Sequence, residues 1–247
     1  MSVYAFYKKR AASESSEFVL DLDSSDADYI IFNGPSNVQT QRDKDIRRNH
    51  FSQLASGSQP EFQTNVQNGL SSILYGVNDR LEGVNDFQTG TAYTIYIVCG
   101  FAGGIPGMLF NNYGVGNVRQ IGISRRSDVG PQFAVYLRDS SANVIVLVVA
   151  CPATAHCLLT IQYASGAAIG SVNGGSYASA FNSSYIAESL AGNNSPYIGS
   201  GRFAGGGGYF APYSGHIDQM RFIPGLLPPA RRDEKRAELI TKWGLPT

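Results

Sequence analysis

Short segments rich in β-branched and aromatic residues recur about every ten residues along most of this chain, separated by Gly, Asn, Asp and Pro. That spacing predicts a sandwich or barrel of antiparallel strands, because a parallel sheet would need helices between its strands. The strongest segments are 18–23, 91–101, 133–139, 143–151, 156–164 and 216–225. We therefore expect an all-β fold, an antiparallel sandwich of two sheets.

Local patterns refine this expectation. In "FVLDLD" (18–23) Phe18, Leu20 and Leu22 alternate with polar positions, which predicts one buried face and one solvent face bearing Asp21 and Asp23. The pairs Asn33-Gly34, Asn68-Gly69 and Asn173-Gly174 tolerate the positive φ of tight hairpins, and we expect turns there.

The last segment, "ARRDEKRAELITKWGLPT" (230–247), differs from the rest because it is charged and has helical spacing. Pro228 and Pro229 precede it and Gly244 follows the last apolar turn, so we predict a helix over about residues 229–243. No Ser or Thr stands where a side chain would cap its start. We expect Leu239, Ile240 and Trp243 to fasten the helix onto the sandwich.

Bulk composition argues against two classes of partner. The 19 basic and 19 acidic residues cancel, so no overall field favours nucleic acid or an anionic membrane. The basic segment 119–126 lacks aromatic residues and is expected to be a solvated strand. The long apolar run 143–161 contains Pro152 and His156 and is interpreted as two buried strands, without a membrane span.

Cysteine usage and the start of the chain suggest no export. Cys99, Cys151 and Cys157 lack paired spacing and are expected to be buried reduced thiols, with a Cys151–Cys157 bridge as the alternative. The first basic residues follow a short apolar stretch, the reverse of a secretory signal. Residues 1–17 are expected to form an edge strand or a frayed terminus, or else an arm that docks on a partner.

An ordered set of motifs resembles a known family. "FVLDLDSSD" (18–26), "TQRDKDIRRNH" (40–50), "SQPEF" (58–62), "NGLSSILYGVNDRL" (68–81) and "VNG" (172–174) precede a closing strand and a helix ending in "KWGL". Over about residues 18–245 this order resembles the concanavalin A-like (laminin G-like) lectin and glucanase jelly-roll domains of phage tail and virion proteins. The resemblance departs at Gln41, where the family has Trp, and at "DIRRN".

The resemblance implies a jelly-roll sandwich and a structural or recognition role in a virion, at a phage tail or capsid surface. It implies other virion proteins, a second copy of the chain and a host surface glycan as partners, and a virion location after synthesis in the host cytoplasm. A glycan hydrolase of the same fold and an architectural component without a ligand are the alternatives. No cofactor is expected.

Residues for hydrolysis or metal binding are sparse. Glycan hydrolysis needs two carboxylates about 5–10 Å apart, and the one candidate pair is Asp21 and Asp23, for which a solubilising role is preferred. "DLDSSDAD" (21–28) offers oxygen ligands for Ca²⁺ but lacks the register of an EF-hand loop. His50, His156 and His216 have no metal-ligand spacing. We therefore predict a non-enzymatic protein without a metal.

The glycine-rich segment 199–215 is either a mobile surface connection or an aromatic contact loop. As a contact loop it would offer aromatic faces to the C–H side of sugar rings. The predicted ligand-binding residues are Phe203, Tyr209, Phe210, Tyr213 and Tyr113.

Overall fold

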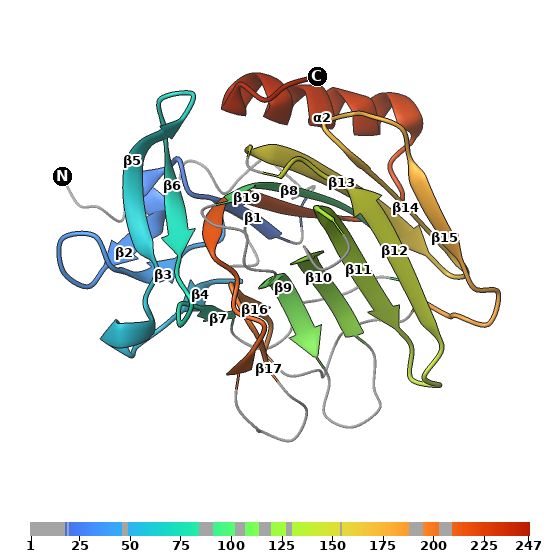
Figure 1. Cartoon of the computed structure of the whole chain (residues 1–247), viewed down its shortest axis with the longest axis horizontal. Coiled ribbons are helices and arrows are strands. Elements are labelled where there is room, and N and C mark those ends of the chain that lie inside the picture. Colours follow the sequence, from blue (N-terminus) through green and yellow to red (C-terminus); the bar gives the residue numbers. More distant parts are fainter. Residues whose placement is uncertain are drawn as a thin grey trace, which may run out of the picture.

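The protein, as a computed structural model, is a sandwich of two antiparallel sheets with one α-helix lying on it (Figure 1). The structure describes residues 18, 20–45, 49–83, 91–101, 107–113, 120–126, 130–153, 155–187, 195–202 and 209–247. The predicted arm at residues 1–17 and the aromatic Phe203 lie outside these residues. The expected all-β sandwich is confirmed.

Sheet A contains eight strands. In spatial order they are β15 (Ala178–Phe181), β14 (Ala167–Val172), β13 (Cys157–Ala164), β8 (Tyr93–Phe101), β19 (Gly215–Pro224), β6 (Leu70–Tyr75) and β5 (Glu61–Gln67). The eighth strand, β1 (Leu20–Asp23), pairs with the second half of β19, so that Asp21 lies opposite Arg221 and Asp23 opposite Gln219. The chain thus joins its first described strand to its last.

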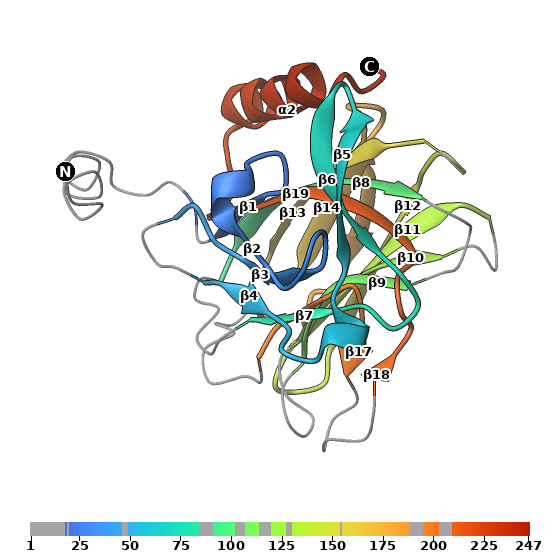
Figure 2. The same cartoon turned by 90° about the vertical axis from the view of Figure 1, so that its left-hand side faces the viewer.

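Sheet B contains nine strands. In order they are β12 (Val144–Ala150), β11 (Gln132–Arg138), β10 (Gln120–Arg126), β9 (Gly107–Tyr113), β16 (Tyr197–Ile198), β7 (Leu81–Gly83), β4 (Phe51–Ser52), β3 (Val38–Gln41) and β2 (Ile30–Phe32). A separate hairpin of β17 (Gly201–Arg202) and β18 (Tyr209–Phe210) lies at the edge of the sandwich (Figure 2). Two 3-10 helices, η1 (Ala27–Tyr29) and η2 (Ser56–Ser58), interrupt the N-terminal half.

Local sequence explains the tight turns between strands. Both residues of Asn68-Gly69, between β5 and β6, and of Asn173-Gly174, after β14, have positive φ, as does Gly34. Asn and Gly accept this backbone region at little cost. The predicted turn positions are confirmed.

Strand β8 explains the unbroken apolar run at 91–101. Ile95 and Ile97 lie in the core between the sheets, whereas Tyr96 and Val98 lie under the C-terminal helix. A strand covered on both faces needs no polar positions, so its sequence does not alternate.

Strand β10 was predicted to be a solvated strand, and this is wrong. Ile121 and Ile123 are in the core, and Arg125 is only 2% exposed.

Helix α2 (Pro229–Trp243) covers the outer face of sheet A (Figures 1 and 2). Its bounds match the prediction: Pro228 precedes it without a side-chain cap, and Gly244 ends it at φ +59° with its N–H donating to Ile240 O and Thr241 O. Leu239 and Trp243 are fully buried, and the half-buried Ile240 packs beside them. Among the described residues no helix is long and apolar enough to cross a bilayer.

Candidate functional site

A line of residues crosses the outer face of sheet B, each directly opposite the next on the neighbouring strand. In order across the sheet they are Val146, Tyr136, Gly122, Asn111, Tyr197 and Glu82. We call this set the sheet B row. Asn111, Gly122 and Tyr197 are buried, so the members of the row that reach solvent are Val146, Tyr136 and Glu82.

Tyr136 is the ring of the sheet B row that reaches the surface. Its neighbours Val135 and Leu137 are fully buried in the core, so alternation turns Tyr136 outward, where it is half-buried. Arg126 Nη1 donates to its hydroxyl over 3.4 Å, and Gly122 beside it carries no side chain. The Tyr136 ring and the Arg126 guanidinium are thus in contact on this face, with the exposed Val146 opposite the ring on β12.

Tyr197, farther along the row, has a structural role. Its ring is 1% exposed, and its hydroxyl donates to Glu82 Oε1 over 2.8 Å. The bond joins β16 to β7 on the outer face of the sheet. Ligand contact on this face is therefore expected at the Tyr136 end.

The predicted aromatic residues divide among three positions. Tyr209 and Phe210 form β18, pairing with Arg202 and Gly201, and β17 of this hairpin contacts β9 and β16 of sheet B. Tyr113 is the last residue of β9 and pairs with Gln120. The structure thus brings the hairpin and the strand of Tyr113 together at sheet B, beside the sheet B row (Figure 2).

Tyr213 lies elsewhere, in the core. It is fully buried, packs edge-on against Phe101 and donates its hydroxyl to Gly100 O over 2.6 Å. Burial raises the pKa of this phenol well above its usual range. The ring therefore cannot contact a ligand at the surface. Tyr213 was predicted to bind a ligand only because it is close in sequence to Tyr209 and Phe210.

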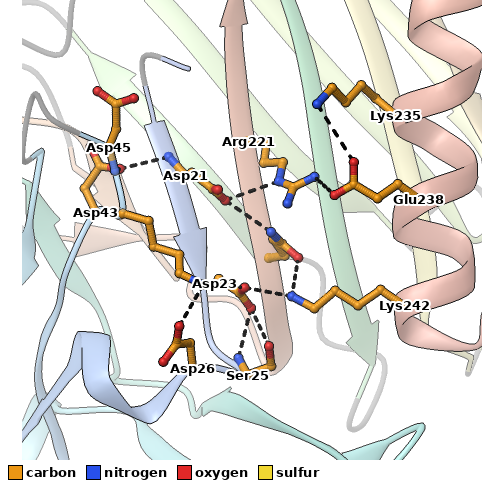
Figure 3. Close-up of polar contacts among 12 residues, drawn as sticks. Asp21, Asp23, Ser25, Asp26, Asp43, Asp45, Arg221, Lys235, Glu238 and Lys242 are labelled. Carbon is orange, nitrogen blue, oxygen red and sulfur yellow. Dashed lines mark hydrogen bonds and ion pairs between the residues drawn. The ribbon is translucent and has the colours of Figure 1, made fainter. Parts of the chain in front are cut away.

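The acidic residues of β1 are not on a solvent face, contrary to the sequence expectation (Figure 3). Asp21 is 9% exposed and accepts from Gln219 Nε2 at 3.1 Å and from Arg221 Nε at 3.3 Å. Arg221 in turn contacts Glu238 of α2 over 2.7 Å. The reason is that β1 pairs with β19 beneath the helix, so both aspartates face basic and amide side chains.

Asp23 lies between two lysines. Its Oδ2 accepts from Lys44 Nζ at 3.0 Å and from Lys242 Nζ at 2.7 Å, while Oδ1 accepts from the backbone and hydroxyl of Ser25 (Figure 3). Burial alone would raise the pKa of this carboxyl, but Lys242, Ser25 and Lys44 together lower it to about 2.

These contacts argue against both chemical roles considered for segment 21–28, glycan hydrolysis and Ca²⁺ binding. A general acid needs a raised pKa and a free proton path, whereas Asp23 is held ionised by ammonium groups. A cation would have to displace Lys44, which also contacts Asp26 at 2.9 Å. In the part of the chain that the structure describes, no group of three His, Cys, Asp or Glu side chains is arranged to hold a metal.

Asp43 organises the neighbouring loop. Its carboxylate accepts from the backbone N–H groups of Asp21, Asp45 and Asn49 at 2.9–3.0 Å, and its own N–H donates to His50 Nδ1. Burial raises the pKa of this carboxyl to about 7, against the lowering effect of the three donors. Asp43 therefore ties β1 to the backbone at Asp45 and Asn49.

His156 is hydrogen-bonded at the edge of the core. Its Nδ1 lies 2.8 Å from Oδ2 of the buried Asp218, which also accepts from the Ser72 hydroxyl. The ring stacks on His216 at 5.4 Å and covers Gly100, where an added Cβ would lie 2.4 Å from His156 Nε2. Burial lowers the pKa of His216.

The three thiols are free, so the alternative disulfide is absent. Cys99 and Cys157 are fully buried opposite each other on β8 and β13, and Cys151 is half-buried. Burial raises the pKa of Cys99 and Cys151, which keeps these thiols protonated and unreactive.

Comparison with known proteins gives the fold. No protein-family model matches the chain, and no curated protein sequence matches it. Domain 4 of AbnA, a GH43 extracellular arabinanase from Geobacillus stearothermophilus in complex with arabinotriose, is similar with a TM-score of 0.59 and 13% identity over 90% of this chain and 98% of that domain.

Two further structures are similar to this chain. The botulinum neurotoxin serotype D binding domain has a TM-score of 0.55 and 11% identity over 94% of this chain and 54% of that one. A GH54 α-L-arabinofuranosidase has the same score and identity over 92% and 60%. At these identities the similarities show the fold alone: a jelly-roll type β-sandwich.

Proposed function

We propose that this protein is a non-enzymatic glycan-recognition module whose binding surface is the sheet B face around Tyr136. The observation that carries the proposal is the half-buried Tyr136 ring, flanked by Gly122 and hydrogen-bonded to Arg126. An aromatic face can stack on the C–H side of a sugar ring, and a guanidinium donates to its hydroxyls. The fold shared with an arabinotriose-bound domain supports the same role.

The contacts of Asp21 and Asp23 support a role without hydrolysis. They are the one carboxylate pair that the sequence offers at alternating strand positions, and both are covered by α2 and paired with basic side chains. A carboxylate used as acid or nucleophile must reach the substrate. We therefore favour recognition over the glycan hydrolase alternative.

Binding is tested on a glycan array, followed by titration calorimetry with the best ligand. We expect arabinose-containing and other neutral oligosaccharides to bind, and Tyr136→Ala to weaken binding at least about tenfold, the effect of losing about 1.4 kcal/mol. Phe32→Ala is the matched control, because Phe32 is also a partly exposed aromatic, at the opposite edge of the sheet. An empty array would contradict glycan recognition, and hydrolysis that is lost in Asp21→Asn/Asp23→Asn would restore the enzyme alternative.

The finer proposal, drawn from the motif resemblance, is that the chain belongs to a virus particle, at a phage tail or capsid surface. We expect mass spectrometry of purified particles to find the protein in fixed proportion to the major structural proteins. Presence in particles together with an empty glycan array would favour the purely architectural role. Absence from particles would contradict the virion proposal and leave glycan recognition standing.

A further inference from the structure

Apart from β1, which pairs only with β19, the two sheets end in two strands at each end of the sandwich, and the two ends differ. Strands β2 and β5 lie at one end and β12 and β15 at the other (Figure 1). Exposed backbone N–H and C=O groups on an edge strand can pair with another strand, and proteins prevent this with charges, bulges or short strands. The question is which edges of this protein carry such protection.

The β2/β5 end is protected. Strand β2 has three residues and an irregular register at Phe32, and β5 begins with the exposed Glu61 and shifts register between Gln63 and Gln67. Shortness, a charge and a bulge are the three usual devices against edge pairing.

At the β12/β15 end, strand β15 is also short, with four residues, but β12 carries none of these devices. Strand β12 has seven residues in unbroken register with β11, and residues 140–187, which include both edge strands, contain no Asp, Glu, Lys or Arg in a chain that is 15% charged. Alongside exposed serines, five large apolar side chains are exposed here. They are Val144, Val146, Val148, Phe181 and Ile186, which are 39–77% exposed.

The backbone of β12 also has hydrogen-bonding groups directed outward. Asn143 O accepts from Asp139 N, and Cys151 N donates to Pro131 O. The backbone groups of the odd-numbered residues of β12 are therefore the ones directed at β11. Backbone groups of alternate residues point to opposite sides of an antiparallel strand. The N–H and C=O groups of Val146, Val148 and Ala150 therefore point away from β11, on the side where β12 has no hydrogen-bonded strand among the described residues, although β15 of sheet A contacts β12. Val144 O is already bonded to Asn182 Nδ2, which marks where the edge ends.

We propose that β12 is a dimerisation strand, pairing antiparallel with β12 of a second copy about a two-fold axis and joining the two sheet B layers. A second copy is the occupant that fits, because the strand is its own complement. In the register that places Val146 opposite Val148 of the second copy, Val144 lies opposite Ala150 of that copy. Each exposed side chain then meets a small apolar one, and no charge opposes another.

Residues of sheet A extend the same interface. Phe181 ends β15, and Asn182, next to it, is bonded to Val144, so the exposed Phe181 ring borders the β12 edge. A stable dimer buries about 800 Å² of surface on each partner, which is more than one strand edge supplies. The exposed Phe181 and Ile186 add apolar area to the β12 edge.

The first test is the molar mass of the intact chain by light scattering after size-exclusion chromatography, with a reductant present so that Cys151 cannot cross-link copies. We expect twice the chain mass for the wild type and the chain mass for Val146→Lys/Val148→Lys. The control is Leu54→Lys/Val77→Lys, which places the same charges on exposed apolar residues outside the β12/β15 end and should leave the dimer intact. A monomeric wild type, or a dimeric Val146→Lys/Val148→Lys variant, would overturn the proposal.

The second test separates pairing from misfolding. Val146→Glu/Val148→Glu should also be monomeric, but mixing it with Val146→Lys/Val148→Lys should restore a dimer, because opposite charges then face each other across the axis. In the wild type, hydrogen exchange at the amides of Val146 and Val148 should be slow and should become fast in either charged variant. Failure of the mixture to dimerise, or fast exchange in the wild type, would rule out the edge pairing.

Discussion

Replacing Trp243 by Ala is expected to lower the free energy of unfolding by about 3–5 kcal/mol, the usual cost of removing a large buried aromatic. Trp243 is fully buried between α2 and sheet A, among Tyr96, Val98 and Leu158. Its indole N–H donates to Gln219 Oε1 over 3.1 Å, and the cavity left by truncation would leave that acceptor with one donor fewer. Urea denaturation followed by tyrosine fluorescence and far-UV circular dichroism measures the loss.

The control is Trp243→Phe, which keeps much of the buried ring and removes the indole donor. We expect it to cost less than half as much as Trp243→Ala, because cavity volume contributes more than one hydrogen bond. Leu226→Ala, on a side chain that is 53% exposed just before the helix, should change stability by less than about 0.5 kcal/mol. An unchanged unfolding midpoint for Trp243→Ala would mean that α2 does not contribute to the stability of the sandwich.

The fold could be predicted from local patterns because most of its determinants are local. Strands such as 91–101 and 156–164 have the composition of buried strands, Asn-Gly pairs mark turns, and prolines and Gly244 set the ends of α2. In each case neighbouring residues decide the backbone conformation, so one sequence is enough to predict it.

The candidate site could be predicted only in part because it depends on which strands are neighbours. Asp21 and Asp23 alternate with leucines, which is typical of a strand with a solvent face, but pairing with β19 places Gln219 and Arg221 beside them and α2 above. No local pattern reveals a pairing between residues about two hundred positions apart. The motif "DQMR" on β19 was the available signal, since it places polar side chains in a strand that closes a core.

The aromatic residues illustrate the same limit. Tyr213 belongs by sequence to the glycine-rich segment, yet its ring is in the core, whereas Tyr136, in the predicted strand 133–139, reaches the surface. Only the register of β10, β11 and β12 shows that Tyr136 faces outward next to a glycine. Surface position was thus decided by tertiary contacts that composition does not encode.

Asp23→Asn is expected to lower the free energy of unfolding by about 2 kcal/mol at neutral pH, with the difference from the wild type vanishing near pH 2. The folded pKa of Asp23 is about 2, below the usual 3.8 of an unpaired aspartate. Above about pH 4 the carboxylate is ionised in both states and its ion pairs contribute fully. As the pH falls from about 4 through about 2 the folded state must also take up the proton, and the contribution is lost.

The pKa of the partner Lys242 is lowered as well. Burial lowers it most, and Lys44 and Arg221 add to this, against the attraction of Asp23. The difference between variant and wild type from pH 2 to pH 7 reports on the Asp23 carboxyl, because that is the group the variant removes. Glu234→Gln, which removes an exposed pair with Arg231, is the control and should change stability by less than about 0.5 kcal/mol throughout. Equal loss at pH 2 and pH 7 in Asp23→Asn would contradict the electrostatic account. It would instead indicate that Asp23 stabilises the protein through shape and neutral hydrogen bonds, which an asparagine only partly replaces.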